Sequence, residues 1–187
     1  DDSFNCVTID DHTSTNDTVA ILASGESDVV VRSYAERRVF AEALLEVCQS
    51  LAQQVAADGE GATKLVTVRV RGVASDAVAR AIARAIADSP LVKCAMHGND
   101  PNWGRIVSAA GMAGAPFNPR GAVLALQGVV VFRRGAPVAF DAAKLSKSLD
   151  APRVSIDLDC GGGGAGTTFW TCDLSREYVA INADYHT

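Results

Sequence analysis

Long apolar runs are missing from this 187-residue chain, and so are the marks of a secreted protein. No stretch approaches the roughly 18–20 apolar residues that a bilayer-spanning helix needs. The first six residues, DDSFNC, carry neither the basic flank nor the apolar stretch of a signal peptide. We therefore expect a soluble protein of the cytoplasm with no membrane span.

Positive charge is also scarce. The chain has 17 Lys and Arg residues against 22 Asp and Glu residues, which gives a formal net charge of −5. The basic residues are scattered and form no tail, whereas binding to nucleic acid phosphates needs clustered Lys and Arg. The composition therefore argues against nucleic acid as a partner.

Patterns typical of metal sites and disulfide frameworks are absent. The five cysteines are odd in number and form no CxxC motif, and there are only three histidines. Cys94 and His97 alone have a ligand-like spacing, and a structural zinc site needs four ligands. We therefore expect reduced thiols, no metal site and no cofactor.

The chain does contain enough apolar material for a core. Hydrophobic residues make up 48% and charged residues 21%, which fits one or two domains and excludes intrinsic disorder as the main state. Apolar residues at helical spacing between Phe40 and Val55 predict an amphipathic helix over residues 33–57. Alternation over residues 65–71 predicts a strand with one solvent-facing side.

The same patterns predict the remaining elements. Further helices are expected at residues 75–89, 105–113 and 142–149. Further strands are expected at residues 91–96, 123–126, 129–132, 138–140, 153–158 and 167–173. Strands alternating with helices, some joined as hairpins, indicate a mixed α/β (α+β) fold.

A glycine-rich segment, CGGGGAGTT at residues 160–168, comes close to a phosphate-binding loop. Gly161 and Gly166 have the required spacing, but Thr167 stands where that motif needs lysine. The residues that follow are β-branched and aromatic, as in a strand, whereas a phosphate-binding loop precedes a helix. We therefore interpret the segment as a connection between two strands.

Hydroxyl and amide side chains gather in TSTNDT at residues 13–18. Such side chains commonly bond their own backbone in turns and helix caps. A polar cluster beside the apolar residues 19–22 is also suited to lining a site for a small polar substrate. The residues alone favour the first interpretation without excluding the second.

Four segments together resemble one known family. They are TSTNDT at residues 13–18, DGEGATK at 58–64, GNDPNWGRI at 98–106 and YVAINADYHT at 178–187. In this order they resemble the β chain of the ornithine acetyltransferase family, the bifunctional glutamate N-acetyltransferases. The resemblance implies a layered αββα fold of the N-terminal-nucleophile type.

The turn-rich stretch at residues 89–101 predicts a domain boundary near residue 90. Residues 1–90 would be the β-chain part of the catalytic domain. Residues 91–187 would form a smaller C-terminal α/β domain whose tail returns to the active site.

The implied function is an acetyl transfer in arginine biosynthesis, from N-acetylornithine to glutamate, with acetyl-CoA as a further donor in some members. In the family a precursor cleaves itself before a threonine, which becomes the nucleophile of the β chain while its freed amine acts as the base. An acetyl-threonine intermediate divides one difficult transfer into two easier steps. The implied partner is an α chain of the same precursor, in an α2β2 heterotetramer.

Carried over by motif, the family's substrate contacts fall on Glu60, Asn182 and Thr187. Glu60 stands between two glycines, where its carboxylate either pairs with a substrate ammonium or is an ordinary solvated loop group. We expect residues 178–181 to form a strand-like anchor that delivers Asn182 and Thr187 to the site.

We expect no catalytic residue within this chain. It begins with Asp1 rather than threonine and lacks the family's cleavage motif, so the isolated chain is expected to be inactive. The alternatives are an amidase or aminopeptidase in which water replaces glutamate, and a non-catalytic scaffold half. His97 and His186 are expected to be non-catalytic, and Arg105 either binds a carboxylate or pairs internally.

Overall fold

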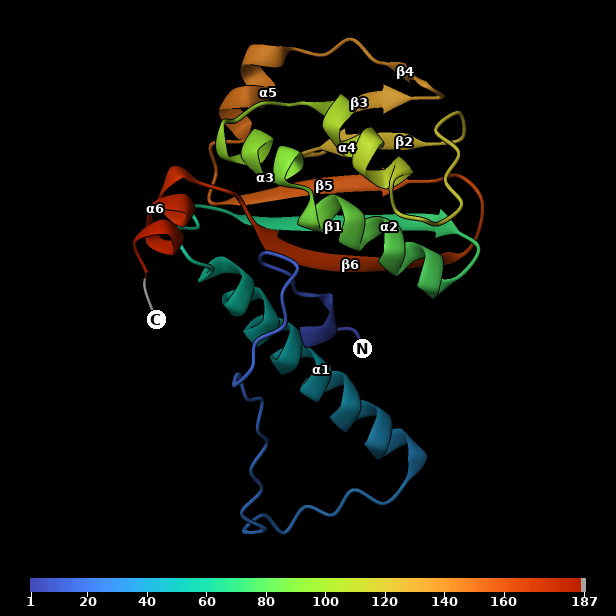
Figure 1. Ribbon diagram of the computed structural model, residues 1–187. Helices are drawn as coiled ribbons and strands as arrows, with labels where there is room; N and C mark the ends of the chain where they lie inside the picture. The colour runs from blue at the N-terminus through green and yellow to red at the C-terminus, as the bar shows by residue number, and fades with distance from the viewer. Residues whose placement is uncertain (186–187) are drawn as a thin grey trace.

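The chain folds around one six-stranded mixed β-sheet. This structure is a computed structural model that describes residues 1–185. The strand order across the sheet is β4-β3-β2-β5-β1-β6 (Figure 1). The strands are β1 (Leu65–Val73), β2 (Val123–Leu126), β3 (Val129–Arg133), β4 (Ala136–Pro137), β5 (Arg153–Asp159) and β6 (Ala165–Cys172). The helices are η1 (Phe4–Cys6), α1 (Tyr34–Ala57), α2 (Asp76–Asp88), α3 (Pro90–His97), α4 (Trp103–Gly111), α5 (Ala142–Ser148) and α6 (Arg176–Asp184). The predicted mixed α/β class is confirmed.

Strand β1 joins the two kinds of pairing in this sheet. It runs parallel to β5 and antiparallel to β6, so that Val68 lies opposite Ile156 on one side and Phe169 on the other. The alternation along β1 puts Val66, Val68 and Val70 on the same face, and all three are buried. The strand predicted over residues 65–71 is therefore confirmed.

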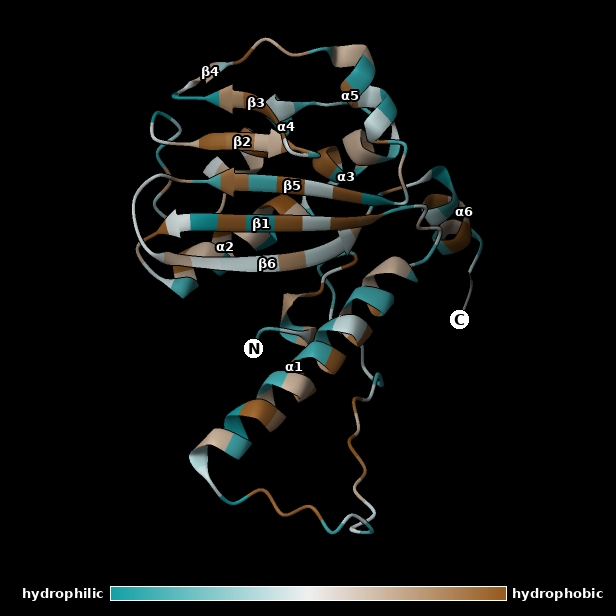
Figure 2. Cartoon of the chain, turned by 180° about the vertical axis from the view of Figure 1, so that it is seen from behind, coloured by the Kyte–Doolittle hydropathy of each residue, from teal (hydrophilic) through white to brown (hydrophobic). Residues whose placement is uncertain are grey.

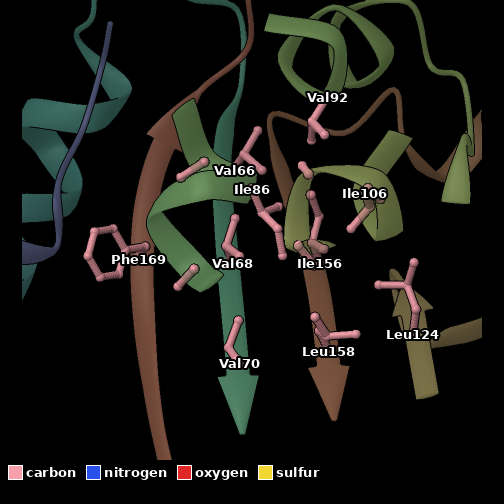
Figure 3. Close-up of a cluster of buried hydrophobic side chains, with 14 of the residues drawn as sticks. Val66, Val68, Val70, Ile86, Val92, Ile106, Leu124, Ile156, Leu158 and Phe169 are labelled. Carbon is pink, nitrogen blue, oxygen red and sulfur yellow. The ribbon is translucent and has the colours of Figure 1, made fainter. Parts of the chain in front are cut away.

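Helices α2, α3 and α4 cover this face and close the core. Figure 3 shows Ile86 of α2, Val92 of α3 and Ile106 of α4 among the buried side chains of the strands. On α2, Ile82 and Ile86 are fully buried, four residues apart on one face of the predicted helix. Each such side chain contributes about 1.5–3 kcal/mol by leaving water.

Most of the opposite face of the sheet is open in the described part of the chain, whereas its β6 edge is covered by α1. Figure 2 looks onto it, with the strands in front of the helices. Cross-strand ion pairs lie on this face: Arg69 Nη1 is 2.9 Å from Asp157 Oδ1, and Arg71 Nε is 2.9 Å from Asp159 Oδ2. Both pairs are largely solvent-exposed, so they contribute little to stability.

Helix α1 begins where its local signals predict. The Ser33 side chain accepts from Glu36 N while the Glu36 carboxylate accepts from Ser33 N, which is a capping box. The predicted helix is present, but its apolar stripe is not buried in this chain, because the stripe residues are 36–57% exposed. Those residues are Phe40, Leu44, Val47, Leu51 and Val55. Only the C-terminal half of α1 meets the sheet, beside β6 (Figure 1).

The strand predicted at residues 91–96 is wrong, because these residues belong to helix α3. Ser89 caps this helix by accepting from Val92 N, and Pro90 occupies its first turn, where a missing N–H is harmless. Val92 and Met96 are four residues apart and both buried. The short apolar run was compatible with either element, and the cap decided for the helix.

Two further strand predictions also fail. Residues 178–181 lie in helix α6, which Ser175 caps by accepting from Tyr178 N. In the β3–β4 hairpin the last strand is Ala136–Pro137, ahead of the predicted residues 138–140. A proline cannot donate to a neighbouring strand, and this one sits at the sheet edge, where that costs nothing.

The glycine-rich segment connects β5 to β6, as predicted, and passes across the end of β1. Cys160 N donates to Arg71 O at 2.8 Å, and Gly162 N donates to Gly72 O at 2.8 Å. At Gly163, with φ +156°, a side chain would collide with the Val73 carbonyl. The glycines therefore allow this segment to cross the end of β1 with the two backbones in close contact.

The division into residues 1–90 and 91–187 is not visible as a break in this sheet. Strand β1 comes from the first range and the other strands come from the second. Within residues 1–185, no helix combines the length and apolar character that crossing a bilayer requires.

Candidate functional site

Glu60 lies in a tight turn that follows α1. The helix ends at Ala57, and the turn returns the chain to β1. Gly61 has φ +64°, and a Cβ there would lie 2.5 Å from Tyr178 N. Only glycine fits this left-handed position against a neighbouring backbone. Gly61 therefore allows α6 to approach the turn.

Helix α6 is bonded to this turn through its N-cap residue, Ser175. Ser175 Oγ donates to Gly61 O at 2.6 Å and accepts from Tyr178 N at 3.2 Å. One hydroxyl thus caps α6 and holds the turn that carries Glu60.

Two of the three predicted substrate-binding residues meet in the structure. Asn182 Nδ2 donates to Glu60 Oε2 at 2.7 Å across 122 residues of sequence, and Asn182 Nδ2 also donates to Tyr178 O at 2.9 Å. Both side chains are exposed and available to a ligand. Thr187, the third predicted residue, and His186 lie outside the described residues.

A buried carboxylate lies directly beneath the Glu60 turn. Asp173 Oδ1 accepts from Thr63 N and from Lys64 N, both at 2.8 Å. Asp173 Oδ2 accepts from Thr63 Oγ1 at 2.6 Å and lies 2.7 Å from His97 Nδ1. Burial acts to raise the pKa of Asp173, but these hydrogen bonds outweigh it and hold the pKa below its ordinary value.

Lys64 is the buried cation next to this carboxylate. Its Nζ donates to Met96 O and Leu149 O, both at 2.8 Å, and to Asn99 Oδ1. Removal from water lowers the pKa of Lys64, with Asp173 acting against the shift. The lysine of the DGEGATK motif therefore anchors the ends of α3 and α5 rather than facing solvent.

Tyr178 and Asp10 border the Glu60–Asn182 pair. Tyr178 Oη donates to Asp10 Oδ2 at 3.1 Å. Burial, together with the charges of Asp10 and Glu60, raises the pKa of Tyr178. The segment that carries Asp10 is itself held by buried Lys93, whose Nζ donates to Ile9 O at 2.7 Å.

Sequence reasoning did not find Asp173, Tyr178 or Asp10 as neighbours of the site. Asp173 is a single carboxylate after a strand, a pattern that usually belongs to solvent-facing groups. Tyr178 begins one of the four family motifs and was expected only in a strand-like anchor. The one usable signal was the position of Ser175 as a helix cap, since a helix beginning there would bring Tyr178 and Asn182 to one side.

The TSTNDT segment forms a local turn rather than part of this site. Ser14 Oγ accepts from Asn16 N at 3.3 Å and Asp17 N at 3.0 Å, and Thr18 Oγ1 donates to Asn16 O at 3.2 Å. Residues 13–18 are all exposed. Of the two interpretations left open, these contacts match the local-turn one.

Side chains of the GNDPNWGRI segment make internal contacts. Asn102 caps α4, and Trp103 stacks on Phe132 with ring centroids 5.3 Å apart. Arg105 Nη1 donates to Leu91 O at 3.0 Å, which matches the internal alternative for this residue. Asn99 contacts Lys64 and thus joins the segment to the buried network beneath Glu60.

Within residues 1–185, no three His, Cys, Asp or Glu side chains converge as metal ligands would. A hollow of about 500 Å³ lies between α1 and the open face of the sheet, away from Glu60 and Asn182. Its lining is mainly polar and includes Gln49, Gln53 and Arg69.

The whole sequence, residues 1–187, matches the ArgJ family. The chain belongs to the ArgJ family. Among curated ArgJ relatives, the arginine biosynthesis bifunctional protein ArgJ of Deinococcus radiodurans is 49% identical over 185 residues, covering 99% of this chain and 46% of that protein. The glutamate N-acetyltransferase of Methanopyrus kandleri is 47% identical over 189 residues, covering 100% of this chain and 49% of that protein.

A solved ArgJ structure has the same fold. The crystal structure of the arginine biosynthesis bifunctional protein argJ from Bacillus halodurans superposes with a TM-score of 0.93 at 39% identity, covering 98% of this chain and 88% of that chain. The resemblance drawn from the four motifs is thus confirmed. This ArgJ-family chain spans about half the length of the curated relatives it matches.

Proposed function

We propose that this chain is the β-chain part of a glutamate N-acetyltransferase that transfers an acetyl group from N-acetylornithine to glutamate in arginine biosynthesis. The observation that carries the proposal is the Glu60–Asn182 pair, which brings two motif residues into contact at the surface. The Methanopyrus kandleri relative is named a glutamate N-acetyltransferase, which matches the acceptor in this proposal.

The chemistry of the pair suits this substrate. N-Acetylornithine has a free side-chain ammonium and an α-carboxylate. The Glu60 carboxylate is a strong acceptor for an ammonium group. The Asn182 amide offers both a donor and an acceptor, and in the absence of ligand it occupies the Glu60 oxygen that an ammonium would take.

The proposed reaction proceeds through an acetyl-threonine. The threonine hydroxyl attacks the acetyl carbonyl and its proton passes to the base, which returns it to the leaving nitrogen as the amide bond breaks and ornithine departs. The amine of glutamate then attacks the acetyl-threonine and gives a proton to the base; the ester bond breaks, N-acetylglutamate departs, and the base returns the proton to the threonine oxygen. We place this threonine, freed by self-cleavage of a precursor, in the part of the relatives that this chain does not span, and assign residues 1–187 to substrate binding. Acetyl-CoA is the proposed alternative donor.

We further propose an α chain of the same precursor as partner, in an α2β2 assembly in the cytoplasm. The support is the apolar surface that lies open on this chain. It comprises the α1 stripe and the segment before it, where Val19, Ile21 and Leu22 are 66%, 70% and 95% exposed. Figure 2 shows α1 and the loop before it projecting away from the sheet, with hydrophobic stretches in brown along both. Apolar surface of this extent is typical of protein interfaces.

The tail of the proposed C-terminal domain, residues 91–187, would complete the site by adding Asn182 and Thr187. The contact of Asn182 with Glu60 supports this arrangement for the first of the two.

The test is Glu60→Gln in the complex of this chain with its proposed α chain. Loss of one charged hydrogen bond costs about 1.5–3 kcal/mol, so kcat/KM for N-acetylornithine should fall about 10- to 150-fold. Glu46→Gln, an exposed carboxylate on α1, is the matched control and should leave the rate unchanged.

The product identifies the reaction class. Formation of N-acetylglutamate supports the proposal. Release of acetate with no N-acetylglutamate would replace it with an amidase, and no turnover by the verified complex would favour the scaffold alternative. An unchanged kcat/KM in Glu60→Gln would show that Glu60 is an ordinary solvated carboxylate.

A further inference from the structure

We propose that Asp173 is a positioning residue for Glu60. Its buried carboxylate holds the turn that carries Glu60 against the helix that carries Asn182. The functional part of this inference rests on the proposed substrate-binding role of Glu60, whereas its structural part stands on the contacts alone.

The hydrogen bonds of Asp173 hold the end of the Glu60 turn. Three of its contacts reach Thr63 and Lys64, directly after the Glu60 turn. The side chain of Asp173 is fully buried, so both oxygens depend on these partners and on His97. A carboxylate that accepts two backbone N–H groups sets the path of the loop more tightly than a single bond would.

Asp173 lies between the end of β6 and the start of α6. It follows β6 directly, and its N donates to Lys64 O at 3.3 Å. Ser175, two residues later, holds Gly61 and starts α6. Residues 173–175 thus bond the turn on one side and set the origin of the helix on the other. The relative position of Glu60 and Asn182 follows from this short segment.

The Glu60–Asn182 contact does little by itself to hold the turn and α6 together. Both side chains are exposed, and flexible exposed side chains lose entropy on meeting. Their 2.7 Å contact requires the two backbones to be held in place from beneath. In the described structure, the groups that bridge the turn and the start of α6 are Asp173 and Ser175.

The first experiment measures the turn without any reaction. Ala62 N donates to Gly59 O at 2.9 Å inside the turn and does not touch Asp173. In Asp173→Asn, the amide side chain keeps its size but loses one acceptor, so the amide hydrogen of Ala62 should exchange about tenfold faster than in the wild type. Asp76→Asn, an exposed carboxylate at the start of α2, is the control. Unchanged exchange at Ala62 overturns the proposal.

The second experiment uses steady-state kinetics of the complex with its proposed α chain. Because Asp173 acts through Glu60, Asp173→Asn should raise KM for N-acetylornithine about tenfold and leave kcat nearly unchanged. The double variant with Glu60→Gln should be no worse than Glu60→Gln alone. A fall in kcat at constant KM, or effects that multiply in the double variant, would show a merely structural role and overturn the proposal.

A second variant keeps both experiments conclusive if Asp173→Asn fails to fold. Thr63→Val removes the hydroxyl that donates to Asp173 Oδ2 while keeping the shape of the side chain and the buried charge. It should change Ala62 exchange and KM in the same direction as Asp173→Asn, by a smaller factor. If the wild-type complex transfers no acetyl group while Ala62 exchange still responds to both variants, the proposed function fails and the positioning role of Asp173 stands.

Discussion

Replacing Lys64 by methionine tests the buried network beneath the site. Methionine matches the length of the lysine stem but has no ammonium group. The Lys64 residue is 7% exposed, so no water takes the place of the lost donors. The carbonyls of Met96 and Leu149 near the ends of α3 and α5 lose their bonds, and so does the Asn99 side chain.

The magnitude follows from these three acceptors. Leaving a buried acceptor without a donor costs about 1–3 kcal/mol. Part of this loss in stability is offset, because the variant no longer buries a charged ammonium group. Burial of that group is the main cause of the lowered pKa of Lys64. We expect a net loss of about 3 kcal/mol, which lowers Tm by about 6–12 °C in a protein of this size.

The assay is calorimetry of the assembled protein at several pH values. Lys64 releases its proton at a lower pH in the folded state than its ordinary pKa of 10.5. Between these two pKa values the unfolded chain holds more protons, so raising the pH through this window stabilises the wild type. The Tm difference between wild type and Lys64→Met should therefore grow toward pH 10.5.

Lys144→Met, at an exposed position on α5, is the control and should stay within about 0.5 kcal/mol of the wild type. A Tm for Lys64→Met within 2 °C of the wild type, with no pH trend, would refute the reasoning.

Two further predictions concern local chemistry. Burial raises the pKa of the Cys160 thiol to about 11, so at pH 8 iodoacetamide should label the exposed Cys94 well before Cys160; peptide mass spectrometry checks this, and equal labelling would contradict it. Gly61→Ala should cost about 1–2 kcal/mol in backbone strain alone, with the collision at Tyr178 N adding to it. The control is Gly164→Ala, where a Cβ meets nothing within 4 Å; equal melting temperatures for the two variants would contradict the close approach of α6.

The elements that depend on local signals could be predicted from the sequence. Helix α1 begins at Ser33 and Glu36 because that capping box is a contact within four residues. Alternation revealed β1 and β5, since one face of each is buried. The failures at residues 91–96 and 178–181 arose where a short apolar run fits both a strand and a helix and the preceding serine cap was not used.

The candidate site could be predicted only in part from the sequence. Glu60 and Asn182 were found through long motifs shared with a family, because no rule of local chemistry singles out one loop carboxylate and one amide. Asp173 was missed, since its burial depends on β6 lying beside β1, with Leu65 opposite Cys172. No pattern within one segment reports that pairing.

By itself, the sequence of this chain determined helices α1 and α2, its alternating strands and its family. The tertiary structure decided which apolar faces are buried and which distant polar groups meet. The stripe on α1 has the spacing of a buried face, yet Phe40 and Val47 are exposed in this chain. Glu60 and Asn182 are brought together by the pairing of β1 with β6 and by the carboxylate of Asp173 beneath them. Periodicity reports only that a face is apolar or a residue polar, whereas burial and contact are properties of segments far apart in the chain.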